Sequence, residues 1–502
     1  MMMLLQKAMA LVALAPAAMA MTCDDATVNW VWSGAMTSSS LRLRVSTSMT
    51  DPGCSPDAVQ LHVMQAAGAA SVYEATKQAM GPSTWLLDFH ATDLVPGPMQ
   101  YEVRYGADTV LKAQTGAISL PPAPGTPTSF EIAFSSCADQ DSNPKVFETI
   151  AKHNPLFFLH MGDLHYDNIE VNDVQVFRSA YETMFASPAG KAMLGMDLPM
   201  AYMWDDHDFG PDNSDGTAPG REASLQVYRE YVPHYPLQDK PGAIAPEERP
   251  IQQAFTIGRV RFLVTDLRSQ RTPNTDPDVP TKSVLGPAQK LWFKRELLAA
   301  SSPESAVGLI VWVNTMPWID DERKWGHFKY EQAELVAFLT EHDLNTRVPI
   351  VIASGDAHML AVDDGSHSPG HLPTFHAAAL GRPGSIKGGP YSHGAIPGSG
   401  RFGLMRFDDD GSRICLRYSG RNLHDDELLA FDTCHPVAGT AFYPPPIFVR
   451  QLTRGIRKLY SRALTKWLRA SPLELAALAS LVLGLVGLLL VRNKHTRPAK
   501  RD

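Results

Sequence analysis

The sequence has little cysteine, no internal repeat and no excess of basic residues. Only five cysteines occur among 502 residues, and the formal net charge is -8. Because nucleic-acid backbones select proteins with clustered lysine and arginine, this balance excludes nucleic acid as a general structural partner. At 502 residues the chain is also long for a single hydrophobic core, and this length indicates two or three domains.

Long apolar runs occur only near the two ends of the chain. Residues 1–20 contain one lysine, an apolar stretch and the small-x-small site Ala18-Met19-Ala20, which is typical of a secretory signal peptide. Residues 472–491 are apolar apart from Glu474 and are just long enough to cross a bilayer. We predict a transmembrane helix there, and a buried core helix is the alternative.

Basic residues lie on both sides of this second apolar run. The stretch 450–470 precedes it, and the tail 492–502 follows it. The tail fits the cytoplasmic side, but positive charge on both sides leaves the orientation open, so we infer it from the signal peptide. The stretch 450–470 is either a juxtamembrane helix on anionic headgroups or a solvated stalk.

Five cysteines in an exported chain leave one unpaired. Local pairing gives two disulfides, Cys23–Cys54 and Cys415–Cys434. The remaining thiol is Cys137, which ends a predicted strand beside Asp139. A buried spare thiol is the ordinary interpretation, and a metal ligand is the functional one.

The chain divides into two differently patterned regions. Residues 21–120 alternate apolar and polar side chains in short runs, as in Leu41-Arg42-Leu43-Arg44-Val45, which is typical of an antiparallel β-sandwich. The proline-rich segment 121–129 is a linker. From 130 to 440 apolar strands alternate with helical patterns and then give way to a β-rich stretch, which predicts an α/β layered domain.

Four blocks of metal-seeking residues follow apolar strands of this second region. They are Ser136-Cys137, Gly162-Asp163-Leu164-His165-Tyr166, Trp204-Asp205-Asp206-His207-Asp208 and Gly355-Asp356-Ala357-His358. Each block should lie at the carboxyl end of its strand, where ligands of an open α/β sheet converge. Carboxylates and imidazoles on neighbouring strand ends can hold two cations about 3.5–4 Å apart. The blocks therefore predict one dinuclear metal site.

The residue types indicate which ions this site would hold. Asp163 can bridge two ions, because each carboxylate oxygen can bind one of them. Cys137 and Tyr166 offer a thiolate and a phenolate, which favour a strongly Lewis-acidic ion such as Fe³⁺. Asp206 and Asp356 offer oxygen ligands to a harder divalent ion such as Ca²⁺, Mn²⁺ or Mg²⁺.

The same residues indicate a hydrolytic reaction at phosphorus. A metal-activated hydroxide would form near neutral pH and attack phosphorus in line. His207 would protonate the departing alkoxide. His358, next to Asp356, is better used as a metal ligand.

These blocks resemble the alkaline phosphatase D (PhoD-like) branch of the calcineurin-like metallophosphoesterases. The resemblance covers about residues 130–420 and includes the stretches 265–271 and 285–292. It implies a layered α/β metallophosphoesterase domain preceded by a β-sandwich, and a centre of Fe³⁺ and a divalent metal, expected to be Ca²⁺, that cleaves phosphate monoesters and diesters. The implied iron ligands are Cys137, Asp163, Tyr166 and His358, and the implied ligands of the second metal are Asp163, Asp206 and Asp356.

One block departs from the family pattern. Another ligand, commonly a histidine, is expected near Val313, where this chain has Asn314. Asn314 and Asn213 are alternative ligands, and a structural turn is a third interpretation. Arg268 and Arg271 are candidate phosphate contacts, and for Arg268 a structural ion pair with Asp266 is the alternative.

The sequence therefore predicts a membrane-anchored metal-dependent phosphomonoesterase or phosphodiesterase, with a phosphate ester as its substrate. We expect a secretory-pathway or exported single-pass membrane protein whose catalytic domain, 130–440, is extracellular or lumenal. A lipid or teichoic-type diester is an alternative substrate. A catalytically silent surface binding protein on the same scaffold is the alternative function.

Overall fold

The structure is a computed structural model that describes residues 23–437 apart from 67, 69, 115–117, 238–248 and 303. The predicted signal peptide, the basic stretch 450–470, the apolar run 472–491 and the tail 492–502 all lie outside the described residues.

In the part of the chain that is described, no helix could cross a membrane. The longest of these helices, α6 (Gly286–Ala300), has 15 residues, whereas a transmembrane helix needs about 20. On this finding the C-terminal transmembrane helix of the predicted fold class and the single-pass localisation that depended on it are not supported, and neither is retained.

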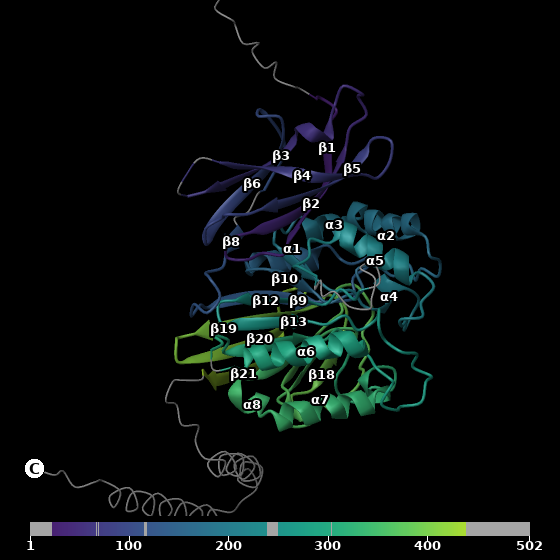
Figure 1. The fold of residues 1–502 in the computed structure, drawn as a ribbon, viewed down its shortest axis with the longest axis vertical. Helices are drawn as coiled ribbons and strands as arrows, with labels where there is room; N and C mark the ends of the chain where they lie inside the picture. Colours follow the sequence, from purple (N-terminus) through teal and green to yellow (C-terminus); the bar gives the residue numbers. More distant parts are fainter. Residues whose placement is uncertain are drawn as a thin grey trace, which may run out of the picture. The chain divides into compact units, whose positions relative to one another are not determined.

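The first eight strands form one antiparallel sheet, drawn in purple and blue in Figure 1. They are β1 (Thr27–Gly34), β2 (Leu41–Ser48), β3 (Val59–Gln65), β4 (Ser71–Ala79), β5 (Thr84–Ala91), β6 (Gly97–Tyr105), β7 (Thr109–Ala113) and β8 (Ile118–Leu120). Their order is β1-β2-β5-β4-β3-β6-β7, with β8 beside β6. Strand β4 pairs with β3 through Ser71–Glu74 and with β5 through Ala75–Ala79, so it joins two halves of a sandwich-like arrangement.

A six-stranded sheet with the order β11-β10-β9-β19-β20-β21 begins the second region. Its strands are β9 (Phe130–Ser135), β10 (Phe158–His160), β11 (Met200–Tyr202), β19 (Arg401–Asp409), β20 (Arg413–Asn422) and β21 (Glu427–Pro436). Strands β9, β10 and β11 are parallel. Their carboxyl ends therefore share one edge of the sheet.

A seven-stranded sheet with the order β12-β13-β14-β15-β17-β16-β18 packs against it. Its strands are β12 (Gln253–Ile257), β13 (Val260–Val264), β14 (Leu309–Val313), β15 (Ile350–Ser354), β16 (Met359–Asp363), β17 (Thr374–Ala377) and β18 (Ala395–Pro397). Alternate residues of β14 face two cores: Val311 lies in the cluster between the sheets, and Trp312 packs with residues of α6 and α7. Burial on both faces explains why this strand is apolar throughout.

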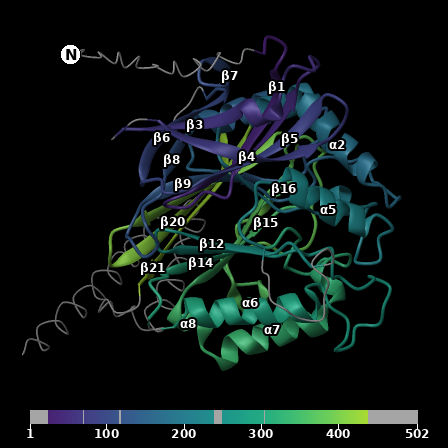
Figure 2. The same ribbon diagram turned by 45° about the horizontal axis from the view of Figure 1, so that its top comes forward.

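Helices cover the two sheets. They are α1 (Lys145–Lys152), α2 (Val174–Ala186), α3 (Pro188–Leu194), α4 (Asp206–Phe209), α5 (Arg221–Tyr231), α6, α7 (Lys329–Glu341) and α8 (Leu344–Arg347). Figure 2 shows α6 and α7 side by side over the seven-stranded sheet. The described chain is thus a mixed α/β fold with a sandwich-like N-terminal part, as the sequence predicted.

The N-terminal sheet packs on α2 and α5 through aromatic side chains of β1. The Trp30 ring lies 4.9 Å from that of Phe185 and 5.6 Å from that of Tyr231. Its indole nitrogen also donates a hydrogen bond of 2.9 Å to Glu182. This contact is well buried, because Trp30 is only 6% exposed.

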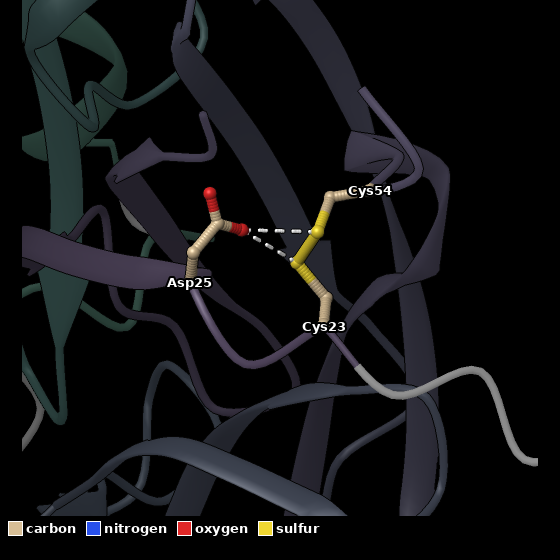
Figure 3. A group of neighbouring side chains, drawn as sticks. All are labelled: Cys23, Asp25 and Cys54. Atoms are coloured by element: carbon tan, nitrogen blue, oxygen red, sulfur yellow. Dashed lines mark hydrogen bonds between the residues drawn. A yellow bond between two sulfur atoms is a disulfide. The ribbon is translucent and has the colours of Figure 1, made fainter. Parts of the chain in front are cut away.

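Both predicted disulfides are confirmed, and Cys137 remains a free buried thiol. Asp25 lies beside the first disulfide, with Oδ1 3.1 Å from the sulfur of Cys23 and 3.0 Å from that of Cys54 (Figure 3). Because the two sulfurs are bonded to each other, this group offers no thiolate to a metal ion.

Candidate metal centre

Three predicted ligands directly follow strands and share an unusual backbone conformation. Cys137, Asp163 and Asp356 have φ angles of +62°, +56° and +58°. Residues other than glycine seldom adopt this left-handed conformation, and it is concentrated at functional sites. The Cys137 amide donates to the Gly162 carbonyl at 3.0 Å, so the loops after β9 and β10 are tied together where both strands end.

Two glycines allow these loops to approach one another closely. A Cβ atom on Gly162 would overlap the backbone nitrogen of Asp205, and one on Gly355 would lie 2.5 Å from Oγ of Ser136. A side chain at either position would therefore push two loops of the site apart. This explains why glycine precedes Asp163 and Asp356.

Four predicted ligands gather around one carboxylate, and we call them the first group: Cys137, Asp163, Tyr166 and His358. The Tyr166 hydroxyl donates to Asp163 Oδ2 at 3.0 Å and lies 3.4 Å from His358 Nε2. The Cys137 sulfur lies 3.5 Å from the same Asp163 oxygen. These are the four residues that the family resemblance implied as iron ligands, and the structure brings them close together.

Burial and negative neighbours dominate the electrostatics of the first group. Burial, together with nearby carboxylates led by Asp206, raises the pKa of Asp163 well above its usual value. Burial likewise raises the pKa of Cys137 and of Tyr166, and lowers that of His358. Burial therefore disfavours the ionised carboxylate, thiolate and phenolate forms of these side chains, and a bound cation would stabilise those forms.

Three further carboxylates form what we call the second group: Asp205, Asp206 and Asp356. Their ligand atoms lie within 4.8 Å of one another. Asp205 Oδ2, Asp206 Oδ1 and Asp356 Oδ2 are buried and have no hydrogen-bond partner among the described residues. Asp206 also lies within the same distance of Asp163 and His207, so the two groups are contiguous. Asp205 was not among the predicted ligands.

Two lysines lie within the second group, and sequence reasoning missed both. Lys324 is 1% exposed, and its ammonium nitrogen lies 2.7 Å from Asp356 Oδ1 and 3.9 Å from Asp206 Oδ2. Lys387 lies 3.1 Å from the same Asp356 oxygen. Burial alone would raise the pKa of Asp356, but the two lysines outweigh it and hold the pKa below its usual value.

Arg268 supplies a third positive charge to the second group. Its Nε donates to Asp205 Oδ1 at 2.5 Å, and its Nη2 lies 3.4 Å from Asp206 Oδ1. The side chain is 0% exposed. Of the two roles left open for Arg268, the geometry gives the structural one: it neutralises buried carboxylates.

Asp208 holds two loops of the site together. Its Oδ1 accepts the amides of Leu164 at 2.6 Å and His165 at 3.3 Å, and its Oδ2 accepts the amide of Asp205 at 3.0 Å. Burial raises the pKa of Asp208 to about 7. Both oxygens of this carboxylate accept hydrogen bonds from backbone amides. Asp208 therefore positions the loop that carries Asp163 and is not assigned as a metal ligand.

His207, the predicted catalytic residue, lies at the edge of the first group. Its ring centroid is 4.0 Å from that of Tyr166, and its amide donates to Asp163 Oδ1 at 3.2 Å. Its Nδ1 lies 2.6 Å from Asn168 Oδ1, and its Nε2 lies 3.6 Å from Asp212 Oδ1. Burial lowers the pKa of His207 below its ordinary value.

The two asparagines considered as extra ligands are engaged elsewhere. The Asn314 amide oxygen accepts the indole N–H of Trp325 at 2.9 Å, and its amide nitrogen donates to Met316 at 2.9 Å. Asn213 touches Asp206 through its backbone amide at 2.7 Å. For Asn314 this arrangement agrees with the structural-turn interpretation.

Comparison with known proteins identifies the region that contains both groups. Residues 132–379 match the family model described as PhoD-like phosphatase. These residues are a PhoD-like phosphatase domain. The match includes every predicted site residue from Cys137 to His358, and it makes the chain a hydrolase of phosphoric ester bonds.

One of the solved structures that match the chain supports its fold. The chain is similar to purple acid phosphatase PPD1 from yellow lupin (Lupinus luteus) seeds, with 12% identity, a TM-score of 0.53, and coverage of 80% of this chain and 73% of that one. It also matches a 5'-nucleotidase precursor from Thermus thermophilus at 14% identity and a TM-score of 0.26, covering 66% and 59%. No curated protein matches the chain.

The two groups of this PhoD-like phosphatase differ in how well they fit a metal ion. The first group brings thiol, phenol, carboxylate and imidazole side chains together through contacts of 3.0–3.5 Å, a set of donors that fits a strongly Lewis-acidic ion. The second group offers three buried oxygens that accept no hydrogen bond from the described residues, which fits a hard divalent ion. In the second group, however, lysine and arginine already lie against the same carboxylates.

Proposed function

We propose that this metal-dependent phosphoesterase hydrolyses phosphate monoesters and diesters with a dinuclear centre built on Asp163. The observation that carries the proposal is the close approach of Cys137 and Tyr166 to the Asp163 carboxylate, with His358 beside the Tyr166 hydroxyl and Asp206 contiguous to Asp163. Fe³⁺ is assigned to the first group. Ca²⁺, ahead of Mn²⁺ or Mg²⁺, is assigned to Asp163, Asp206 and Asp356.

When bound, the two ions supply Lewis acidity and a hydroxide nucleophile near neutral pH. The chain's own residues hold and orient the reacting groups. Asp208 fixes the loops after β10 and β11 through their backbone amides, and the left-handed turn at Asp163 brings its carboxylate to the shared strand edge. Such preorganisation matters because small displacements of catalytic groups cost much of the rate.

His207 is assigned the proton transfer to the leaving group. Asn168 Oδ1 can accept a hydrogen bond from Nδ1–H, so the second proton of the imidazolium form lies on Nε2 and is the transferable one. Asp212 lies near Nε2 and favours its protonated form. The leaving alkoxide would take the Nε2 proton as the bond to phosphorus breaks.

Arg382 is assigned a contact with the substrate phosphate. Its guanidinium carbon lies 4.2 Å from the centre of the Tyr166 ring, and its side chain is 38% exposed. Its Nη1 is bound to Asp139 at 3.0 Å, which holds the group beside the site. A planar guanidinium in this position can bind a phosphate oxygen.

A leaving-group series tests the role of His207. His207→Ala should slow diesters with basic leaving groups far more than diesters with acidic ones, because only the former need a proton in the transition state. His342→Ala, a histidine substitution just after α7, is the matched control and should leave both rates unchanged. Equal losses for both kinds of diester would rule out the general-acid role.

A further inference from the structure

The two groups of the centre differ in how their charge is balanced. Within the described chain, the arginine and lysine ion pairs of the site go to Asp205, Asp206 and Asp356, not to Asp163. The described lysines and arginines therefore leave the neutralisation of the first group to protons or to a bound metal ion. The second group already contains fixed positive charge.

The balance in the second group is close to complete. Its three carboxylates face three cations, namely Arg268, Lys324 and Lys387. The carboxylates are 1–3% exposed, and Lys324 is 1% exposed. Solvent therefore screens these charges weakly, and a divalent ion added to the intact set would leave uncompensated buried positive charge.

Lys324 is the lysine that lies near two carboxylates assigned to the second metal. Its ammonium lies between Asp356 and Asp206, two of the carboxylates assigned to that ion. Lys387 binds both the carboxylate and the backbone carbonyl of Asp356 at 3.1 Å. Lys387 is 17% exposed, so it has a route to solvent that Lys324 lacks.

We propose that Lys324 and Lys387 compete with the second metal ion for Asp356 and Asp206. The chain then holds one ion tightly in the first group, and it binds the second ion weakly, in exchange for the lysine contacts. This proposal rests on the dinuclear centre of the proposed function. It adds that the occupancy of the second position follows the concentration of divalent ion.

Removing one lysine should strengthen binding of the second ion. Two like charges a few ångströms apart repel strongly even at an effective dielectric of about 20. We expect Lys324→Met to lower the Kd of the second ion at least tenfold, and Lys387→Met to lower it by a smaller factor, since Lys387 is more exposed. Lys324→Arg keeps the charge and should change the Kd less than threefold.

The experiment is a calorimetric titration of the full-length chain, purified with its bound metal, with Ca²⁺ and separately with Mn²⁺. The matched control is Lys290→Met, because Lys290 is also partly buried and paired, with Glu334 at 2.7 Å. The proposal predicts a lower Kd for Lys324→Met and an unchanged Kd for Lys290→Met.

Three outcomes would overturn the proposal: a wild-type chain that binds two ions with equal affinity, a Kd that Lys324→Met leaves unchanged or raises, or no second ion in any variant. If Lys324→Met fails to fold, Lys387→Met and the ratio of the two wild-type Kd values decide the question. Phosphatase assays of the wild type separate the two proposals. Metal-dependent turnover, together with a Kd of the second ion that Lys324→Met leaves unchanged, would refute the lysine competition and leave the proposed phosphoesterase activity in place.

Discussion

Arg268→Met should lower the free energy of unfolding of the metal-free protein by about 3–5 kcal/mol. Arg268 is fully buried, and it donates to Asp205 at 2.5 Å and to the Ser214 carbonyl at 3.2 Å. Methionine has a similar length but no charge. The Asp205 carboxylate, 1% exposed, would then be buried without its counter-charge. Because total stabilities are about 5–15 kcal/mol, this loss is a large fraction of the whole.

The assay is a double-mutant cycle by urea unfolding in the presence of a chelator. Asp205→Asn removes the charge that Arg268 neutralises, so the double variant should be less destabilised than the sum of the single changes by about 1–3 kcal/mol. Chelation keeps metal binding from contributing to the measured stability. Additive losses would refute the inference that the two charges neutralise each other.

Three further predictions concern the interface, a buried histidine and the first group. Trp30→Ala should cost about 3–5 kcal/mol in urea unfolding, because it empties a buried aromatic contact, whereas exposed Tyr330→Ala should cost little; equal costs would contradict this. Burial lowers the pKa of His160 to about 3, so between about pH 6.5 and that pKa only the unfolded chain takes up this proton, and stability falls as the pH falls. His160→Phe should remove about 1.4 kcal/mol per pH unit of this loss, and an unchanged slope would refute it. Tyr166→Phe should abolish a phenolate-to-iron charge-transfer colour, and a colourless wild type loaded with iron would exclude Tyr166 as a ligand.

The location of the site could be predicted because its residues follow parallel strands. Apolar runs marked the strands, and the carboxyl ends of parallel strands share an edge. The structure places Cys137, Asp163 and Asp356 at such ends. The sequence alone therefore indicated which loops would meet, although it could not give the distances within them.

The charge balance of the site could not be predicted, because it depends on contacts between distant segments. Lys324 lies 32 residues before Asp356 and belongs to no motif of the sequence. Asp208 binds backbone amides more than 40 residues away in the chain, and a backbone amide leaves no trace in residue types. Arg268 could be singled out, but its partner was Asp205 rather than the neighbouring Asp266.

Regular elements were easier to predict than short ones. The helical pattern extended over most of α6, which has 15 residues, whereas β14 was indicated by its uninterrupted apolar run Leu309-Ile310-Val311-Trp312-Val313. Strands β16 and β17 are buried at every position and are only five and four residues long, so no alternation distinguished them.

The most direct test is the hydrolysis of a chromogenic phosphodiester and its monoester counterpart by the full-length chain, with and without added Fe³⁺ and Ca²⁺. Asp163→Asn is the matched variant, since asparagine tolerates the left-handed backbone at this position. We predict metal-dependent turnover that Asp163→Asn abolishes without loss of the fold. Absence of turnover under every metal condition would contradict the proposed phosphoesterase activity and favour a catalytically silent binding protein.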